Sequence, residues 1–272
     1  MGLFNWANMR DMKEGKGVEK KKEPALTVFF GIIQRKIWRL ITLNLAYFIT
    51  GLPTWLFMAA MGFGLYYFHC GRADYNVFLP WMLVLIPFIA LISGPATMGA
   101  TFVLRNFSRE EHAWVLGDMF EKASKNYVQG LFIGLINACL AFALTYLYFY
   151  YGTLQKGLSF VNYILILLGF ILASLRSYIY PMAVTYKLSL ANLYRYSLAL
   201  VIMKFPQNLL LQGFSLAGIC FAFYYPNMGI VISAIGGISL LGLVNVFYTD
   251  RVLRENMDST HEKVYSKKER KE

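Results

Sequence analysis

The chain has 272 residues, of which 57% are hydrophobic and only 15% are charged, and its mean hydropathy is +0.47. An average soluble domain carries about 25% charged residues, so this chain has too few polar side chains to cover a water-facing surface. The composition excludes a soluble enzyme, a disordered chain and a disulfide-rich secreted protein. The net charge of +11 comes from basic residues that flank the apolar stretches. We expect these residues to face an anionic membrane surface, and we expect no binding of nucleic acid.

Long uncharged stretches separate the charged residues, and a helix that crosses a membrane needs roughly 20 apolar residues. The first four such stretches are residues 40–68, 77–104, 128–150 and 158–182, the last of which is interrupted only by Arg176. Residues 205–249 also lack charge but are too long for one helix, and Tyr224-Tyr225-Pro226-Asn227 divides them with a turn-forming sequence. The sequence therefore predicts an all-α fold, a polytopic membrane helix bundle with about six transmembrane helices.

The distribution of Lys and Arg predicts the orientation of these helices. All but three of the 26 basic residues lie in the two tails and in the loops after the second and fourth stretches; the exceptions are Arg72, Lys156 and Arg176. Because basic loops stay in the cytoplasm, we expect a multi-pass protein of the cell membrane with both termini cytoplasmic. The polar beginning of the chain predicts no cleavable signal peptide. The expected parts are residues 1–37 (cytoplasmic tail and interfacial segment), 38–249 (six-span membrane domain) and 250–272 (charged cytoplasmic tail).

Two cytoplasmic interfacial amphipathic helices are expected, over residues 108–126 and 187–204. Ser108 and Glu111 have the spacing of a capping box, which predicts that the first of these helices begins at Ser108. Apolar residues recur behind it at three- and four-residue steps, and ion pairs at four-residue spacing are expected on the other face. The candidate residues for docking a cytoplasmic partner are Glu111, Asp118, Glu121, Lys122 and Lys125.

The two loop regions are alike in sequence. Pro95 precedes the first expected interfacial helix and Lys125-Asn126-Tyr127-Val128-Gln129 follows it; Pro181 precedes the second, and Phe205-Pro206-Gln207-Asn208 follows. Either the chain contains a duplicated unit of span, interfacial helix and span, or two helical hairpins have met the same constraints. A duplication of this kind would be parallel, whereas many secondary transporters have inverted repeats.

Residues that could carry chemistry are few. The sequence has no zinc-protease, nucleotide-binding or serine-hydrolase motif, and its three cysteines have no paired spacing, so we expect no catalytic residue, no metal site, no cofactor and no enzymatic activity. Arg176 is the one charge within an expected span. Its role is either structural or functional. In the first case its long side chain extends to the membrane surface or pairs with an acidic residue such as Asp118 or Asp250; in the second it binds a substrate or a lipid headgroup.

Amides within the spans form a second group of candidates. The candidate intramembrane polar contacts besides Arg176 are Asn44, Asn137, Asn162 and Asn245. Such amides either join helices through hydrogen bonds or line a path for a solute.

Several short motifs resemble those of the YesL-like family of bacterial integral membrane proteins, a domain of unknown function. The motifs that carry the resemblance, densest over residues 38–135, are Leu43-Asn44-Leu45, Gly51-Leu52-Pro53, Gly94-Pro95-Ala96-Thr97, Leu104-Arg105-Asn106, Arg109-Glu110-Glu111-His112 and Asp118-Met119-Phe120 with Lys125-Asn126-Tyr127-Val128-Gln129. In the family the Leu-Pro and Gly-Pro-Ala-Thr elements lie close together, whereas residues 54–93 separate them here. The chain therefore looks like a longer variant with an extra outer hairpin.

The resemblance implies a context of sugar uptake, because family members are often encoded beside carbohydrate ABC importers, but it supplies no active-site residues. We therefore expect a non-enzymatic accessory or scaffold subunit that associates with ABC transporter subunits in carbohydrate uptake. The alternative is a solute transporter or channel in its own right, with Arg176 and the Asn residues along its path. A membrane enzyme is the third and least supported hypothesis.

Overall fold

The computed structural model describes residues 24–69, 93–154 and 159–258, and most of these residues are helical, with no strand among them. Three helices within them are long and apolar enough to cross a membrane, over Tyr127–Leu144, Phe160–Thr185 and Asn227–Met257. The all-α expectation is confirmed for this part of the chain. The expected outer loop with Arg72 and most of the second expected span lie outside the described residues.

The later long helices follow the uncharged stretches of the sequence, whereas the first described helix begins well before residue 40. The first is α2 (Ala25–His69), which contains a break at Lys36, where the backbone has φ −116° and ψ 16°. Residues 93–108 are helical as well. The remaining helical elements, in chain order, are α4 (Val115–Lys125), α5 (Tyr127–Leu154), α6 (Ser159–Thr185), α7 (Leu190–Met203), α8 (Phe205–Tyr224), α9 (Pro226–Ile232), the π-helical turn η1 (Ser233–Gly237), α10 (Ile238–Leu253) and the π-helical turn η2 (Arg254–Asp258).

The turn expected at Tyr224–Asn227 is present, because α8 ends at Tyr224 and α9 begins at Pro226. Pro206 and Pro226 each lie in the first turn of a helix, where a missing N–H costs no hydrogen bond. Composition and proline positions thus determine where these helices begin and end.

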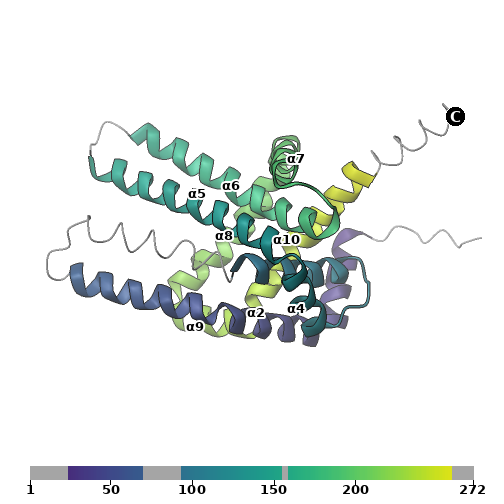
Figure 1. Ribbon diagram of the computed structural model, residues 1–272. Coiled ribbons are helices and arrows are strands. Elements are labelled where there is room, and N and C mark those ends of the chain that lie inside the picture. Colours follow the sequence, from purple (N-terminus) through teal and green to yellow (C-terminus); the bar gives the residue numbers. More distant parts are fainter. Residues whose placement is uncertain (1–23, 70–92, 155–158, 259–272) are drawn as a thin grey trace, which may run out of the picture.

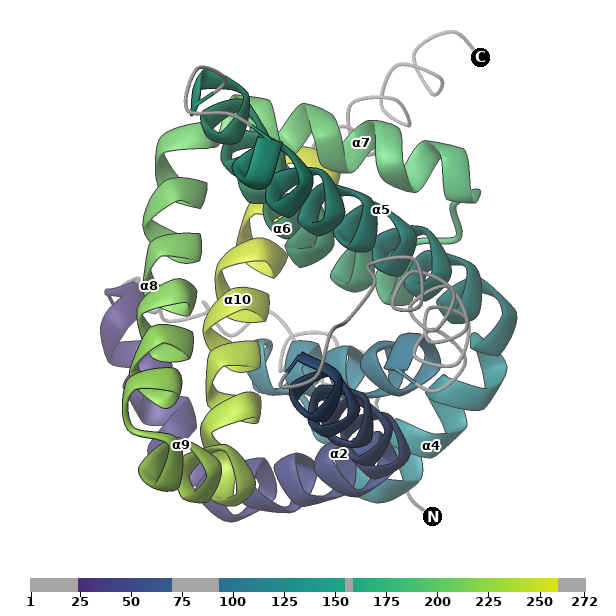
Figure 2. The ribbon, with the colours of Figure 1, turned by 90° about the vertical axis from the view of Figure 1, so that its left-hand side faces the viewer.

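The helices do not all run in one direction (Figures 1 and 2). α5 and α6 lie side by side along the long dimension of the molecule, and the later part of α2 follows the same general direction. α8 and α10 are neighbours that cross this direction, as the turned view shows. Hydropathy sets the length of a helix, whereas its direction depends on which of its faces is packed against which neighbour.

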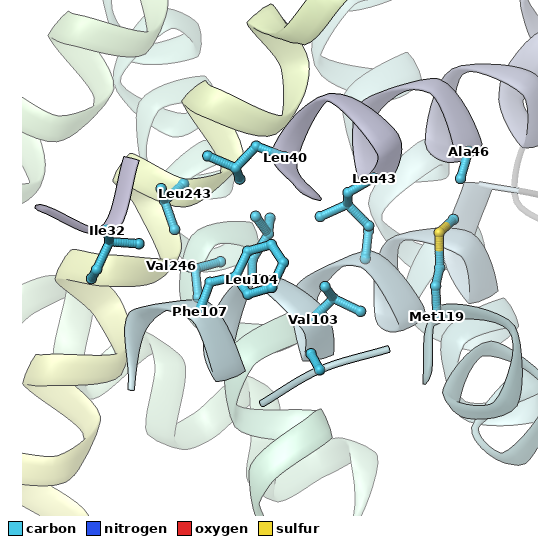
Figure 3. Close-up of a cluster of buried hydrophobic side chains, with 12 residues drawn as sticks. Ile32, Leu40, Leu43, Ala46, Val103, Leu104, Phe107, Met119, Leu243 and Val246 are labelled. Carbon is cyan, nitrogen blue, oxygen red and sulfur yellow. The ribbon is translucent and has the colours of Figure 1, made fainter. Parts of the chain in front are cut away.

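A buried apolar cluster joins α2, the helix of residues 93–108 and α10 (Figure 3). Its members include Leu40 and Leu43 from α2, Phe107 from the second helix and Leu243 from α10, and the exposed fraction of each is 4% or less. Close approach is possible because Gly242 lies opposite Leu104, where a Cβ would come 2.9 Å from a methyl group of Leu104. The cluster fixes these three helices against one another.

Two successive parts of the chain repeat one arrangement: a long helix, a short helix and a further long helix after a single non-helical residue. That residue is Asn126 between α4 and α5 (φ −108°, ψ 21°) and Lys204 between α7 and α8 (φ −110°, ψ 29°). Four residues after each break, the chain packs against the preceding long helix: Gly130 against Pro95, and Asn208 through a 2.8 Å hydrogen bond from the Tyr178 hydroxyl. The two breaks are alike in geometry, and both expected interpretations, a duplicated unit and two hairpins under the same constraints, account for this likeness.

The start expected for the first short helix is wrong. Ser108 ends the preceding helix, and Glu110 has a left-handed backbone with φ 58°. The N–H of Glu111 donates to the Asn106 carbonyl at 2.8 Å and the N–H of Glu110 donates to the Phe107 carbonyl at 3.1 Å, which together form a Schellman motif. The sequence from Ser108 to Glu111 therefore ends one helix instead of starting the next.

α4 begins only at Val115. Its first turn is stabilised by Asp118, whose carboxylate accepts the backbone N–H of Trp114 at 2.9 Å. An acidic side chain in the first turn of a helix also interacts favourably with the helix dipole.

Candidate functional site

Charged side chains from the start of α2, the end of the helix 93–108 and the end of α10 meet at one end of the molecule. We call this group the charged end face; it comprises Arg35, Lys36, Arg105, Arg109, Glu110, Glu111, Asp250 and Arg254. All of them lie in segments that the sequence assigns to the cytoplasmic side or to its boundary. Segments far apart in the chain are therefore tied together by ionic and polar contacts at this end.

Asp250 is the centre of the face, and its side chain is fully buried. The Arg109 guanidinium donates to both of its carboxylate oxygens, with Nε–Oδ1 and Nε–Oδ2 distances of 3.1 Å and an Nη2–Oδ1 distance of 2.6 Å. Arg254 approaches the second oxygen at 3.2 Å. A buried carboxylate is stable only when it is paired and hydrogen-bonded, and these two guanidinium groups meet both requirements.

The electrostatics of Arg109 follow from this pairing. Burial alone would lower the pKa of Arg109, but the hydrogen bond and the negative charge of Asp250 outweigh burial and raise that pKa. The pairing therefore favours the charged form of the Arg109 guanidinium.

Arg105 lies one helical turn before Arg109 and makes a different kind of contact. Its Nη1 donates to the carbonyl of Val184 at 3.2 Å and to the hydroxyl of Thr185 at 3.4 Å, both at the end of α6. Burial lowers the pKa of Arg105, and the positive charge of Arg109 lowers it further. Carbonyls at a helix C-terminus carry partial negative charge, so Arg105 stabilises the end of α6.

The start of α2 is joined to the Schellman turn. Arg35 forms a salt bridge with Glu110, and the Lys36 ammonium donates to the Glu111 carbonyl at 3.0 Å. The same ammonium lies 4.8 Å from the centre of the Phe107 ring. Burial lowers the pKa of Lys36. These contacts hold the left-handed Glu110 in a backbone conformation that L-residues adopt at a cost of about 1–2 kcal/mol.

The five residues expected to dock a partner have divided roles. Glu121 and Lys125 form the expected pair at four-residue spacing, with an O–N distance of 2.6 Å, and Lys125 lowers the pKa of Glu121. The other expected pair is absent: Asp118 caps Trp114, and the Lys122 ammonium lies over the Phe102 ring at 4.7 Å. Glu111, Glu121 and Lys125 therefore remain exposed, whereas Asp118 and Lys122 are used within the fold.

Large apolar side chains are exposed on the same short helix and just before it. The exposed fractions are 74% for Trp114, 49% for Leu116 and 53% for Phe120, whereas Met119 on the opposite side of α4 is buried. His112 stacks edge-on against Trp114 with 5.9 Å between ring centres. α4 thus presents an apolar surface with charged neighbours, which is the composition of a protein or membrane contact surface.

Among the intramembrane candidates, Arg176 and Asn137 both lie near the buried side chain of Tyr180. Arg176 is exposed on α6, one turn before Tyr180, and it interacts electrostatically with Tyr180. Asn137 on α5 is buried; its Oδ1 accepts the Tyr194 hydroxyl at 3.5 Å, while its Nδ2 has no hydrogen-bond partner. Asp250 is not a partner of Arg176, because its oxygens are occupied by Arg109 and Arg254.

Asn44 has a clear structural role. Its fully buried amide donates to the carbonyls of Ser233 and Ala234, both at 2.7 Å, and its Oδ1 accepts the N–H of Ser239 at 2.9 Å. A π-helical turn departs from the regular pattern of backbone hydrogen bonds. The Asn44 side chain supplies hydrogen bonds to backbone groups at the start of η1 and just after its end. This observation favours the helix-joining interpretation for Asn44.

Asn245 also joins helices, and Asn162 stands apart. The Asn245 amide donates to the Ser215 hydroxyl at 3.2 Å and accepts the Ser177 hydroxyl at 3.2 Å. Asn162 lies near the start of α6, at the opposite end from the charged face, and its Oδ1 is buried without a partner. The structure therefore separates the five candidates into four places instead of one site.

Sequence reasoning did not single out Arg105, Arg109 or Arg254 as partners of anything. The signal was present, because Asp250 follows directly after an uncharged stretch and Arg105 and Arg109 are one helical turn apart at the end of another. A buried charge at the end of a helix needs an opposite charge beside it. Arg105 and Arg109 lie at the end of a neighbouring uncharged stretch, where such a partner would be expected.

Within the described residues, no group of three or more His, Cys, Asp or Glu side chains could hold a metal ion. Comparisons of the chain with family models, with curated proteins and with solved structures find no match. Function must therefore be argued from the charged end face, the exposed surface of α4 and the polar residues between the helices.

Proposed function

We propose that the chain is a multi-pass protein of the cell membrane, with about six transmembrane helices and with the charged end face at the cytoplasmic surface. The distribution of basic residues supports this orientation, because positively charged segments stay in the cytoplasm. The contacts of Arg35, Arg109 and Asp250 support it too, since they bring both described ends of the chain to the same end of the molecule.

In this position the protein is a non-enzymatic accessory subunit that binds a membrane-embedded partner through α4. The observation that carries the proposal is the exposed row of Trp114, Leu116 and Phe120, which borders the exposed charges Glu121 and Lys125. In protein complexes, aromatic side chains that become buried at the centre of the interface, with polar and charged groups around them, typically contribute much of the binding energy. α4 is attached to the rest of the fold through Met119, which is buried in the apolar cluster, so its exposed residues face away from that cluster.

The partner we propose is a carbohydrate ABC transporter, because the motifs in residues 38–135 resemble the YesL-like family and that family has a context of sugar uptake. YesL-like membership is likewise a proposal that rests on these motifs. A docking helix on the cytoplasmic side fits such a partner, since the ATPase subunits of these transporters act on that side.

The test is site-specific photo-crosslinking in the native host, with a photoreactive amino acid in place of Phe120. The matched control carries the same amino acid in place of Tyr163, which is 72% exposed on α6. We expect a crosslink to a transporter subunit from position 120 and none from position 163. Equal crosslinking from both positions, or no transporter subunit from position 120, would contradict the proposal.

A second candidate function, a solute transporter or channel, is favoured by the polar group around Tyr180. Asn137 has an unpartnered buried Nδ2, and Arg176 is a charge within an expected span. Unpartnered buried polar atoms and intramembrane charges often mark a substrate path. Purified protein in liposomes would then carry a neutral sugar across the bilayer, and Asn137→Leu would abolish the flux; vesicles without any flux would rule this function out.

A further inference from the structure

A groove runs along the place where the α4–α5 junction meets the connection between α6 and α7. It has a volume of about 510 Å³, and its walls come from the α4–α5 junction and from the connection between α6 and α7. The residues that define it for this argument are Ser124, Lys125, Gln129, Phe132, Leu188 and Ser189. Gln129 joins the two walls, because its Nε2 donates to the Leu188 carbonyl at 3.2 Å.

The two ends of the groove differ in chemistry. One end is polar: Lys125 has a side chain that is 65% exposed, and the hydroxyl of Ser189 does not cap the helix it precedes. The other end is apolar, where Val128 and Phe132 lie one turn apart on α5 with exposed fractions of 63% and 46%. These two residues belong to Tyr127–Leu144, which is apolar and long enough to cross a membrane.

This order of groups along the groove matches the order of groups in a phospholipid. An acyl chain can follow the apolar face of α5, while the phosphate lies at the membrane surface beside an ammonium and a hydroxyl. We propose that this groove binds one anionic phospholipid of the cytoplasmic leaflet, with its phosphate held by Lys125 and Ser189 and its acyl chain against Val128 and Phe132.

Charge favours an anionic lipid over a zwitterionic one. Lys125 is the only charged residue in the described lining of the groove, which gives the polar end an excess of positive charge. A lipid with net negative charge gains from this excess, whereas the choline of a zwitterionic lipid adds a positive charge to it. Glu121 competes with the phosphate for Lys125, since its Oε1 lies 2.6 Å from the Lys125 ammonium.

The proposal uses the cytoplasmic placement proposed above, but it does not use the transporter partner. It also explains why the two units meet at a groove instead of a filled contact: a lipid that touches both would hold the α4–α5 junction and the α6–α7 connection together.

The experiment is native mass spectrometry of the full chain in mild detergent, titrated with phosphatidylglycerol or phosphatidylcholine. We expect phosphatidylglycerol to bind the wild-type chain more tightly. One ammonium near an anionic surface is worth about a fivefold change in affinity, so Lys125→Gln lowers phosphatidylglycerol binding about fivefold. The matched control is Lys204→Gln, at the corresponding break of the second unit and outside the groove, which leaves binding unchanged.

Glu121→Gln provides a test with the opposite sign. It removes the competing carboxylate and raises phosphatidylglycerol affinity, which a merely structural role of the Glu121–Lys125 pair would not do. Equal binding of the two lipids, equal loss in Lys125→Gln and Lys204→Gln, or weaker binding in Glu121→Gln would each overturn the proposal.

Glycerol phosphate is the probe for a soluble ligand in place of a lipid. Millimolar glycerol phosphate that displaces the lipid would also overturn the proposal, because it would identify a soluble phosphate as the occupant. The crosslinking test at Phe120 reports separately on the partner, so failure of one proposal does not imply failure of the other.

Discussion

Replacement of Asp250 by Asn is the most informative perturbation of the fold. The substitution keeps the size of the side chain and removes the charge that faces Arg109 and Arg254. The Arg109 side chain is only 20% exposed, so it would be left as a half-buried cation beside a neutral amide. Removing one partner of a buried ion pair costs 3–5 kcal/mol, and partial access of Arg109 to solvent reduces this cost to about 3 kcal/mol.

The two arginines differ in their expected contributions. Arg109→Gln leaves the fully buried carboxylate with one exposed partner, so we expect a loss of about 3 kcal/mol as well. The Arg254 side chain is 45% exposed, and Arg254→Gln is expected to cost at most about 1 kcal/mol. The double variant of Arg109 and Asp250 leaves no buried charge unpaired, and we expect a coupling energy of about 2 kcal/mol between the two sites.

The assay is reversible unfolding of the full chain in mild detergent by addition of sodium dodecyl sulfate, followed by circular dichroism. The free energy of unfolding is measured for each single variant and for the double variant. A loss below about 0.5 kcal/mol in Asp250→Asn, or equal losses in Arg109→Gln and Arg254→Gln, would refute the argument that a buried bidentate pair holds α10 to the helix of residues 93–108.

Three further predictions concern single positions, and each is checked by the same unfolding measurement. Asn44→Ala leaves the buried Ser239 N–H without its acceptor and is expected to cost about 2–3 kcal/mol, and a loss below 1 kcal/mol would contradict the role assigned to Asn44. Gly94→Ala places a Cβ against the Gly130 backbone and is expected to cost several kcal/mol, whereas Gly213→Ala has open space around it and should be neutral or stabilising by about 0.5–1 kcal/mol. Ser108→Ala should not change the free energy of unfolding because the Ser108 hydroxyl has no partner, whereas Asp118→Ala removes a helix cap and should cost about 1 kcal/mol. A larger loss in Ser108→Ala than in Asp118→Ala would indicate that the helix begins with a capping box at Ser108 after all.

The positions of the helices follow from the sequence because hydropathy and proline are local signals. The uncharged stretch 128–150 lies within Tyr127–Leu154, and the break expected around Pro226 is observed. Helix direction is different, because it depends on side-chain packing between segments far apart in the chain. Nothing in the residues of α10 by themselves shows that it crosses α2 near Asn44.

The start of α4 shows how a local signal can mislead. Ser108, Arg109, Glu110 and Glu111 fit a capping box by composition, but the same four residues form the Schellman end of the preceding helix. Contacts from distant segments stabilise the second structure, such as that of Arg35, which binds Glu110 from a helix more than seventy residues earlier in the chain. A sequence window of a few residues contains no information about that contact.

The candidate polar residues were predicted individually, and their grouping was not. The sequence left two interpretations open for Asn44 and Asn245, and in the structure both form hydrogen bonds to other helices. Asp250 was one of two acidic residues considered as a possible partner of Arg176, and its partners are Arg109 and Arg254. Pairing depends on the depth and the facing direction of each helix, which the tertiary packing determines.

The central claim is that the charged end face lies at the cytoplasmic surface with both ends of the chain. Single cysteines at Thr27, Ser124 and Arg254, in a chain without its native cysteines, can be labelled with a membrane-impermeant maleimide in intact cells and in permeabilised cells. A cysteine at Phe160, at the opposite end of α6, is the control. The account predicts labelling of the first three positions only after permeabilisation and labelling of position 160 in intact cells. Labelling of position 27, 124 or 254 in intact cells would contradict it.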